Sequence, residues 1–124
     1  GSPFIPVIAP IGIGDDGKTY NINADLVAGK MAHILQAGKY LILTNTAGIL
    51  DEKDNLFNSI NAEQVIKLIK KGVISKGMLP KVESALEAVS SGVEHVQIID
   101  GTVEHAVLLE LFTDSGIGTM IHRK

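Results

Sequence analysis

The chain has 124 residues, which is enough for one domain with a modest buried core. Hydrophobic residues make up 45% and charged residues 20%, a composition that indicates a globular domain rather than disorder. Eleven basic against fourteen acidic residues leave a formal net charge of −3 without a basic stripe, so neither nucleic acid nor an anionic membrane is an expected partner.

Two further features narrow the class of protein. The chain has no cysteine, which excludes disulfides and thiolate metal sites and is compatible with a cytoplasmic location. No apolar run approaches the roughly 20 residues of a membrane-spanning helix. The four histidines, His33, His95, His105 and His122, are scattered without zinc-ligand spacing, so no metal site is expected.

The first part of the chain predicts a strand followed by a helix. Residues 1–4 are expected to be a cloning remnant and linker. Residues 5–9 are apolar and β-rich, and we expect a buried strand entered directly, as in a chain cut from a larger protein. Asn23 can cap a helix over about residues 24–36, and Gly38 is expected to stop it.

The rest of the chain continues the alternation. Residues 40–43 predict a parallel strand buried on both faces, and residues 49–60 a polar excursion that includes a hairpin. Asn61 to Gln64 approaches a capping box for a helix ending at Lys71, before Gly72. Later elements are a helix over 79–91, a strand over 93–99, a helix over 104–112 and a strand over 119–121. This order predicts an α/β fold, a three-layer αβα sandwich with a mainly parallel sheet.

Polar side chains gather just before the first helix. Asn21 and Asn23 are two residues apart, so in an extended segment both amides project from one face. Asp25 follows where helical N–H groups lack backbone partners. From the residues alone, the pattern fits an Asx turn with a helix cap as well as a ligand site.

Two other segments have the composition of an anion site. Residues 44–48 follow an apolar strand, and ligands in open α/β sheets bind beyond the carboxyl ends of strands. Their threonines and backbone amides can hold phosphate or ribose oxygens, although the same residues also suit an ordinary turn. Lys81 lies one turn into a predicted helix, where its charge adds to the helix dipole. A solvated surface lysine is the alternative there.

Four motifs together resemble a known family. Residues 19–25, 43–50, 77–81 and 110–119, in this order and spacing, resemble the carboxy-terminal lobe of the N-acetylglutamate kinases, which belong to the amino acid kinase family. The resemblance covers about residues 5–121. It implies that residues 5–124 are the ATP-binding lobe, and that an amino-terminal lobe with glycine-rich loops and a second lysine is missing.

The resemblance also implies roles for individual residues. Lys81 would stabilise the transition state, Asp25 would organise the catalytic lysines, and Asn21 and Asn23 would hold the acetylamino acid. Mg²⁺ is implied with ATP, bound mostly through phosphate oxygens. The nucleotide-contacting set is Thr44, Asn45, Thr46, Ala47, Gly48, Ile49, Leu50, Val73, Ile74, Ser75, Gly77 and Met78.

Two positions depart from the family pattern. Asn45 stands where aspartate is usual, which removes a charge from the nucleotide loop. Lys76 replaces the first glycine of the motif Gly-Gly-Met-x-x-Lys.

The carboxy-terminal motif resembles that of arginine-inhibited members of the family. There, His105, Glu110 and Gly118 would help to form a pocket for free L-arginine. A helix ending in a tight turn explains the same residues without a ligand.

The function that the resemblance implies is ATP-dependent phosphorylation of N-acetyl-L-glutamate in arginine biosynthesis. The lobe alone is expected to be inactive, and its open apolar surface predicts a homo-oligomer. One alternative is another amino acid kinase, acting on glutamate, aspartate, carbamate or uridylate. Another is a nucleotide- or arginine-binding module without catalysis, and a structural interaction domain is the third.

Overall fold

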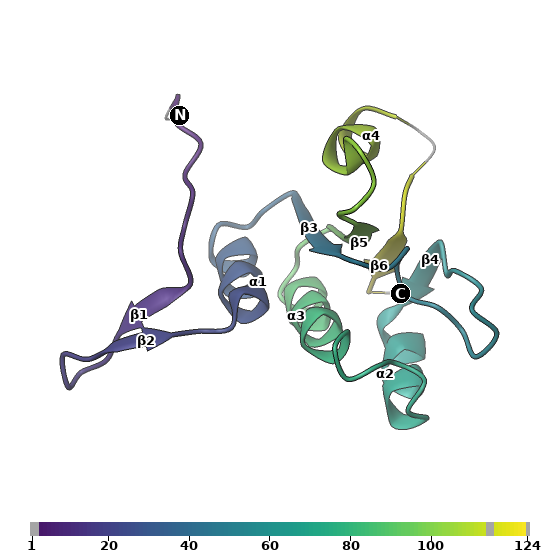
Figure 1. Cartoon of the computed structure of the whole chain (residues 1–124), viewed down its shortest axis with the longest axis horizontal. Coiled ribbons are helices and arrows are strands. Elements are labelled where there is room, and N and C mark those ends of the chain that lie inside the picture. Colours follow the sequence, from purple (N-terminus) through teal and green to yellow (C-terminus); the bar gives the residue numbers. More distant parts are fainter. Residues whose placement is uncertain (1–2, 114–115, 124) are drawn as a thin grey trace.

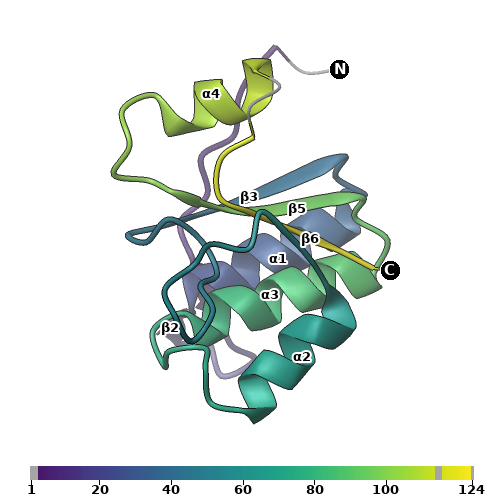
Figure 2. The same ribbon diagram turned by 90° about the vertical axis from the view of Figure 1, so that its right-hand side faces the viewer.

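The structure, a computed structural model, describes residues 3–113 and 116–123. Within this part, three helices cover one face of a four-stranded sheet and a short fourth helix lies on the other face (Figure 2). This arrangement confirms the predicted three-layer architecture. An arm at the amino-terminal end, which contains the first two strands, extends away from these layers (Figure 1). None of the described helices is long and apolar enough to cross a membrane.

The main sheet is mostly parallel, as predicted. Its strands lie in the order β3-β5-β6-β4, with parallel pairing of β3 with β5 and of β4 with β6. β5 and β6 pair antiparallel, so the first residue of β6 lies near the carboxyl ends of β3 and β5. The strands are β3 (Lys39–Thr44), β4 (Ser59–Asn61), β5 (His95–Asp100) and β6 (Thr119–His122).

The helices bury one continuous core against this sheet. Ile42 of β3 and Ile98 of β5 meet Val65 and Val82 from the helices, and all four side chains are buried. Three helices form this layer, and the fourth covers the opposite face. Their bounds are α1 (Ala24–Ile34), α2 (Ala62–Lys70), α3 (Leu79–Ser90) and α4 (Ala106–Phe112).

Local hydrogen bonds start the helices where the sequence predicts. The Asn23 side chain accepts from the backbone amides of Asp25 and Leu26 at the start of α1. Asn61 and Gln64 form a complete capping box on α2. Gly72 has a φ of 72°, the left-handed conformation expected just after a helix.

The predicted strand over residues 5–9 is wrong. That segment is extended but pairs with no described strand, and Ile5 is 91% exposed. Pro6 and Pro10 lack the amide hydrogen that a sheet ladder needs, so the apolar composition alone overstated its strand character. The arm instead forms a small antiparallel hairpin of β1 (Ile11–Ile13) and β2 (Thr19–Asn21).

Other corrections concern the edges of elements. β3 is an edge strand with one buried face, and Leu43 on its other face is 47% exposed, so the prediction of burial on both faces is wrong for β3. The central strand β5 has that pattern instead, because helices cover both faces of the sheet where it lies. α1 ends before Gly38, since Gln36 takes the left-handed conformation with a φ of 48°. α4 begins at Ala106 because His105 is left-handed, with a φ of 57°.

Candidate active site

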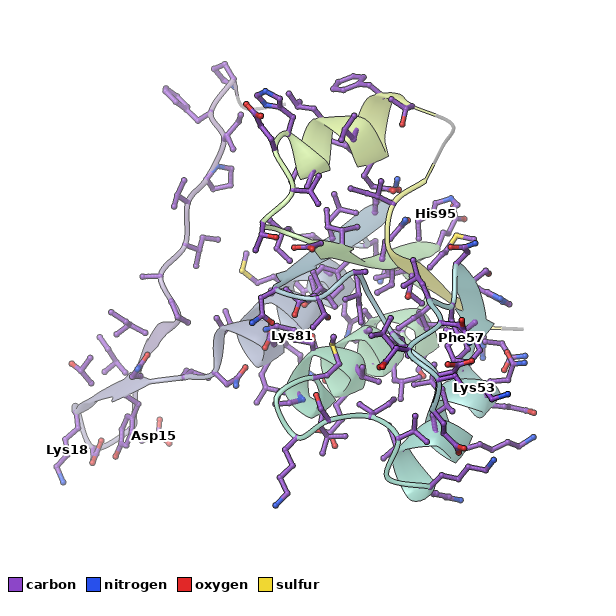
Figure 3. The ribbon with its side chains drawn as sticks, turned by 45° about the vertical axis from the view of Figure 1, so that its right-hand side comes forward. Asp15, Lys18, Lys53, Phe57, Lys81 and His95 are labelled. Atoms are coloured by element: carbon purple, nitrogen blue, oxygen red, sulfur yellow. The ribbon has the colours of Figure 1, made fainter. Side chains whose placement is uncertain are left out.

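Asp25 and Lys81 form an ion pair between the first turns of two helices. Asp25 lies in the first turn of α1 and Lys81 in the first turn of α3. Lys81 Nζ lies 3.0 Å from Asp25 Oδ2 and 3.2 Å from Oδ1. The two side chains are 24% and 21% exposed, so the pair is partly shielded and still open to a ligand. Figure 3 shows Lys81 in the body of the molecule, away from the hairpin tip that carries Asp15 and Lys18.

The first turn of α3 favours an anion through its charge rather than through unused amides. Met78 at its N-cap position makes no side-chain cap, and no acidic side chain lies in the first turn. Of the backbone N–H groups at this start, those of Met78 and Leu79 donate to Ser75, and Pro80 has no amide hydrogen. The dipole of α3 and the charge of Lys81 favour an anion at the same place.

A cavity of about 260 Å³ lies beside this helix start. It combines the loop after β3 with the connection between α2 and α3, two segments that are distant in sequence. Eight of the twelve predicted nucleotide residues line it: Thr46, Gly48, Ile49, Leu50, Val73, Ile74, Ser75 and Met78. The other four, Thr44, Asn45, Ala47 and Gly77, are not among its lining residues.

The loop after β3 is fixed by the start of β6. The Ile49 amide donates to Thr119 Oγ1 at 2.8 Å, and both residues are buried. Gly48 has a φ of 148°, and a Cβ there would meet the Leu56 side chain at 2.8 Å and the Thr119 amide nitrogen at 3.0 Å. The glycine is thus required for the close approach of loop and strand, which places the loop at the carboxyl end of β3.

Two acidic residues that the sequence analysis did not single out also line this cavity, Asp51 and Asp54. Hydrogen bonds from the Asn55 side chain, and from the amides of Asn55 and Lys53, lower the pKa of Asp51 below its ordinary value. This end of the cavity is therefore negative. Lys81 is not among the lining residues, but it follows the lining residue Met78 by three positions. The negative end favours a direction in which the phosphates of a nucleotide lie away from it.

The two asparagines before α1 differ in their surroundings. The Asn23 side-chain oxygen accepts the hydrogen bonds that cap α1, so this atom has the capping role that the sequence offered as an alternative to a ligand site. Asn21 ends β2 and is exposed. A ligand can reach Asn21 from solvent, whereas Asn23 has only its amide NH₂ outside the cap.

A second cavity of about 400 Å³ lies on the face of the sheet that carries α4. Its lining includes the buried side chain of Glu110, which is 5% exposed. Lys39 Nζ lies 2.7 Å from Glu110 Oε1, while Gln97 Nε2 and the Ile117 amide donate to Oε2 at 2.7 and 3.1 Å. A buried carboxylate with a cation and two N–H donors is well compensated.

The three predicted effector residues do not meet in this cavity. Glu110 and Gly118 line it, but His105 does not. The His105 side chain is 69% exposed and lies 3.4 Å from Glu104. His95, Lys39 and Gln97 take part in the lining instead, and Figure 3 shows His95 on the side of the molecule away from the hairpin.

Several of these residues were missed because their partners are distant in sequence. Lys39 and Gln97 join Glu110 only when β3, β5 and α4 come together. Ser84 donates to the Asp25 carbonyl oxygen at 2.6 Å and was also missed. Its position, three residues after Lys81 on the same helix face, is the one signal that the sequence offers.

The sequence matches curated relatives over almost all of its length. It is 62% identical to the acetylglutamate kinase of Nitrosococcus oceani over 123 residues, which are 99% of this chain and 41% of that protein. The chain therefore spans about two fifths of the length of that relative.

Solved structures agree in fold. The N-acetylglutamate synthase of Neisseria gonorrhoeae, complexed with coenzyme A and L-arginine, is 33% identical with a TM-score of 0.84 over 93% of this chain and 27% of that one. Carbamate kinase from Giardia lamblia, bound to AMP-PNP, has a TM-score of 0.71 at 21% identity over 90% of this chain and 36% of that one, which shows the shared fold. The model of the amino acid kinase family matches residues 2–100, and the chain belongs to that family.

Proposed function

We propose that this chain is the nucleotide-binding lobe of an ATP-dependent N-acetyl-L-glutamate 5-phosphotransferase. The reaction would give N-acetylglutamyl 5-phosphate and ADP in arginine biosynthesis in the cytoplasm. The observation that carries the proposal is the Asp25–Lys81 pair at two helix starts, together with the neighbouring cavity that most of the predicted nucleotide residues line. Identity to an acetylglutamate kinase at 62% supports this choice of substrate over the other amino acid kinases.

Lys81 has the donors that phosphoryl transfer needs. An ammonium group has three N–H donors, and two of them reach the Asp25 carboxylate. The third can donate to an oxygen of the transferring phosphoryl group, where negative charge is redistributed in the transition state. Asp25 holds the ammonium in place and has no role as a base.

The two acidic residues of the first cavity favour one direction of the nucleotide. We place the phosphates at the start of α3, near Lys81, and the ribose and base towards Asp51, whose carboxylate can accept hydrogen bonds from hydroxyl or amino groups. The described residues hold no cluster of three or more metal-ligating side chains. We expect Mg²⁺ to be held mainly by ATP oxygens, a mode in which it needs few protein ligands.

The acceptor would lie on the side of Asn21 and Asn23. The exposed Asn21 amide and the Asn23 NH₂ group can bind an acetylamino acid, but two amides cannot surround it. The lobe is therefore expected to bind nucleotide and to need an amino-terminal lobe for turnover.

Calorimetric titration with Mg-ATP tests this proposal. We expect saturable binding by the wild-type chain and weaker binding after Lys81→Ala. The matched control is Lys30→Ala, because Lys30 pairs with Glu87 across the same two helices at 3.2 Å but lies outside the first turn of either helix. Equal loss in both variants, or no binding by a folded wild-type chain, would refute the assignment of Lys81.

The Glu110 cavity favours a second proposal, allosteric inhibition by L-arginine. A buried carboxylate can exchange its lysine partner for a guanidinium or an ammonium group. The similar synthase from N. gonorrhoeae was solved with L-arginine, which supports the ligand. We expect Glu110→Gln to abolish arginine binding and to leave Mg-ATP binding intact. Arginine binding unchanged by that substitution would refute the site.

A further inference from the structure

Two buried hydroxyl groups connect the start of α1 to the rest of the fold. Ser84 Oγ, on α3, donates to the Asp25 carbonyl oxygen at 2.6 Å. The Tyr40 hydroxyl, on β3, lies 2.9 Å from Ser84 Oγ and 3.3 Å from the same carbonyl oxygen. Tyr40 and Ser84 are both buried, so these bonds lie largely away from competing water.

Each of the two hydroxyls has one proton to donate within this network. Because Ser84 donates its single proton to the Asp25 carbonyl, the Tyr40 proton goes to Ser84 Oγ or to that carbonyl. In either arrangement both hydroxyls act on the backbone of Asp25. That backbone is thereby fixed to α3 and to β3 at once.

The network lies beside the proposed catalytic pair. Ser84 follows Lys81 by three residues, so both project from one face of α3. Lys81 binds the Asp25 side chain while Ser84 binds the Asp25 backbone. Gly29 makes this possible, because a Cβ at that position would overlap Ser84 Oγ.

We propose that Ser84 and Tyr40 are positioning residues for the Asp25–Lys81 pair. They hold the Asp25 backbone so that its carboxylate meets the Lys81 ammonium at the start of both helices. This inference rests on the proposed function, since it assigns a purpose to a pair whose role in phosphoryl transfer is itself a proposal. Neither hydroxyl is assigned a contact with substrate.

A loosened pair should slow the reaction more than it weakens binding. Misplacing a reacting group by about 1 Å can cost on the order of a hundredfold in rate. Ser84→Ala leaves Asp25 in the chain and removes one anchor. With an amino-terminal lobe present, we expect roughly a tenfold lower kcat and a change in KM for ATP of less than about twofold.

The direct test is an NMR signal of the pair itself. Scalar coupling across the hydrogen bond joins Lys81 Nζ to the Asp25 carboxylate carbon, and a change in overall stability alone does not move it in a folded protein. We expect Ser84→Ala and Tyr40→Phe to reduce or abolish the coupling. The control is Ser91→Ala, which removes a hydroxyl that donates to the Glu87 carbonyl at 2.7 Å at the C-cap of α3, the opposite end of that helix from Lys81.

The outcomes separate this inference from the proposed function. Unchanged coupling in folded Ser84→Ala and Tyr40→Phe overturns the positioning role, and if Ser84→Ala does not fold, Tyr40→Phe alone decides. A wild-type chain that shows the coupling but binds no Mg-ATP refutes the nucleotide assignment and leaves the network standing. With an amino-terminal lobe present, an unchanged kcat in Ser84→Ala also overturns the inference.

Discussion

Replacing Gly29 by alanine tests the close contact between α1 and α3 most directly. Gly29 is buried in α1, and a Cβ on it would overlap Ser84 Oγ and lie 3.3 Å from the Ser84 carbonyl oxygen. Both atoms belong to Ser84 of α3, and the carbonyl oxygen is a backbone atom. The helices must therefore separate, or the Ser84 hydroxyl must leave the Asp25 carbonyl.

The expected cost follows from three opposing effects. Overpacking a core contact costs about 2 kcal/mol, and losing the buried hydrogen bond adds about 1 kcal/mol. Alanine in a helix interior returns about 1 kcal/mol relative to glycine. The free energy of unfolding should thus fall by about 2 kcal/mol, which at this chain length lowers Tm by roughly 8 °C.

Urea and thermal unfolding of Gly29→Ala, its control and the matching variants in a Ser84→Ala background provide the assay. Gly38→Ala is the control, because a Cβ there meets nothing within 4 Å, and it should be neutral or slightly stabilising. In a Ser84→Ala background the main overlap is gone, so Gly29→Ala should cost close to nothing there. If Gly29→Ala is as stable as Gly38→Ala in the wild-type background, the contact between the helices is not as described.

Three further predictions concern single positions. Burial raises the pKa of Tyr40 above 10.0, so its contribution to stability is present below about pH 10 and is lost as pH rises through the folded pKa. Absorbance titration of a Tyr20→Phe variant should therefore show a midpoint above that of free tyrosine, and a midpoint at about 10 would contradict the burial. Gly118→Ala should cost more than about 3 kcal/mol in urea unfolding, because φ is 81° and a Cβ would overlap the backbone of β5. Gly72→Ala, with a φ of 72° and open space, should cost only about 1 kcal/mol, and equal costs would argue against the overlap. Asn61→Ala should destabilise by about 1 kcal/mol through loss of the α2 cap, and no change in urea midpoint would show that the cap contributes nothing.

Local signals in the sequence were sufficient for most of the secondary structure. A helix cap acts on amides two or three residues away, so Asn23 and Asn61 identify the starts of α1 and α2 without any tertiary information. Gly72 and Gly92 likewise follow the ends of α2 and α3 with positive φ values of 72° and 99°. The alternation of elements then indicated the layers.

Apolar composition gave wrong predictions for two segments whose burial depends on neighbouring elements. The run at residues 5–9 lacks a neighbouring strand, and β3 has a neighbour on one side only. Both errors have one cause: a strand is buried by what packs around it, and its own residues do not reveal its place in the sheet.

The proposed site also has a part that the sequence predicts and a part that only the tertiary structure shows. The sequence alone determined the candidates Asp25 and Lys81 and the order of motifs that placed the chain in its family, because these depend on residue types at fixed spacing. Only the tertiary structure brought Lys81 Nζ to 3.0 Å from the Asp25 carboxylate. It also brought Ser84 into a hydrogen bond with the Asp25 carbonyl, and Lys39 into an ion pair with Glu110. Those contacts join residues 56, 59 and 71 positions apart. No local pattern encodes them, since they form only when packing of the core fixes the helices and strands against one another.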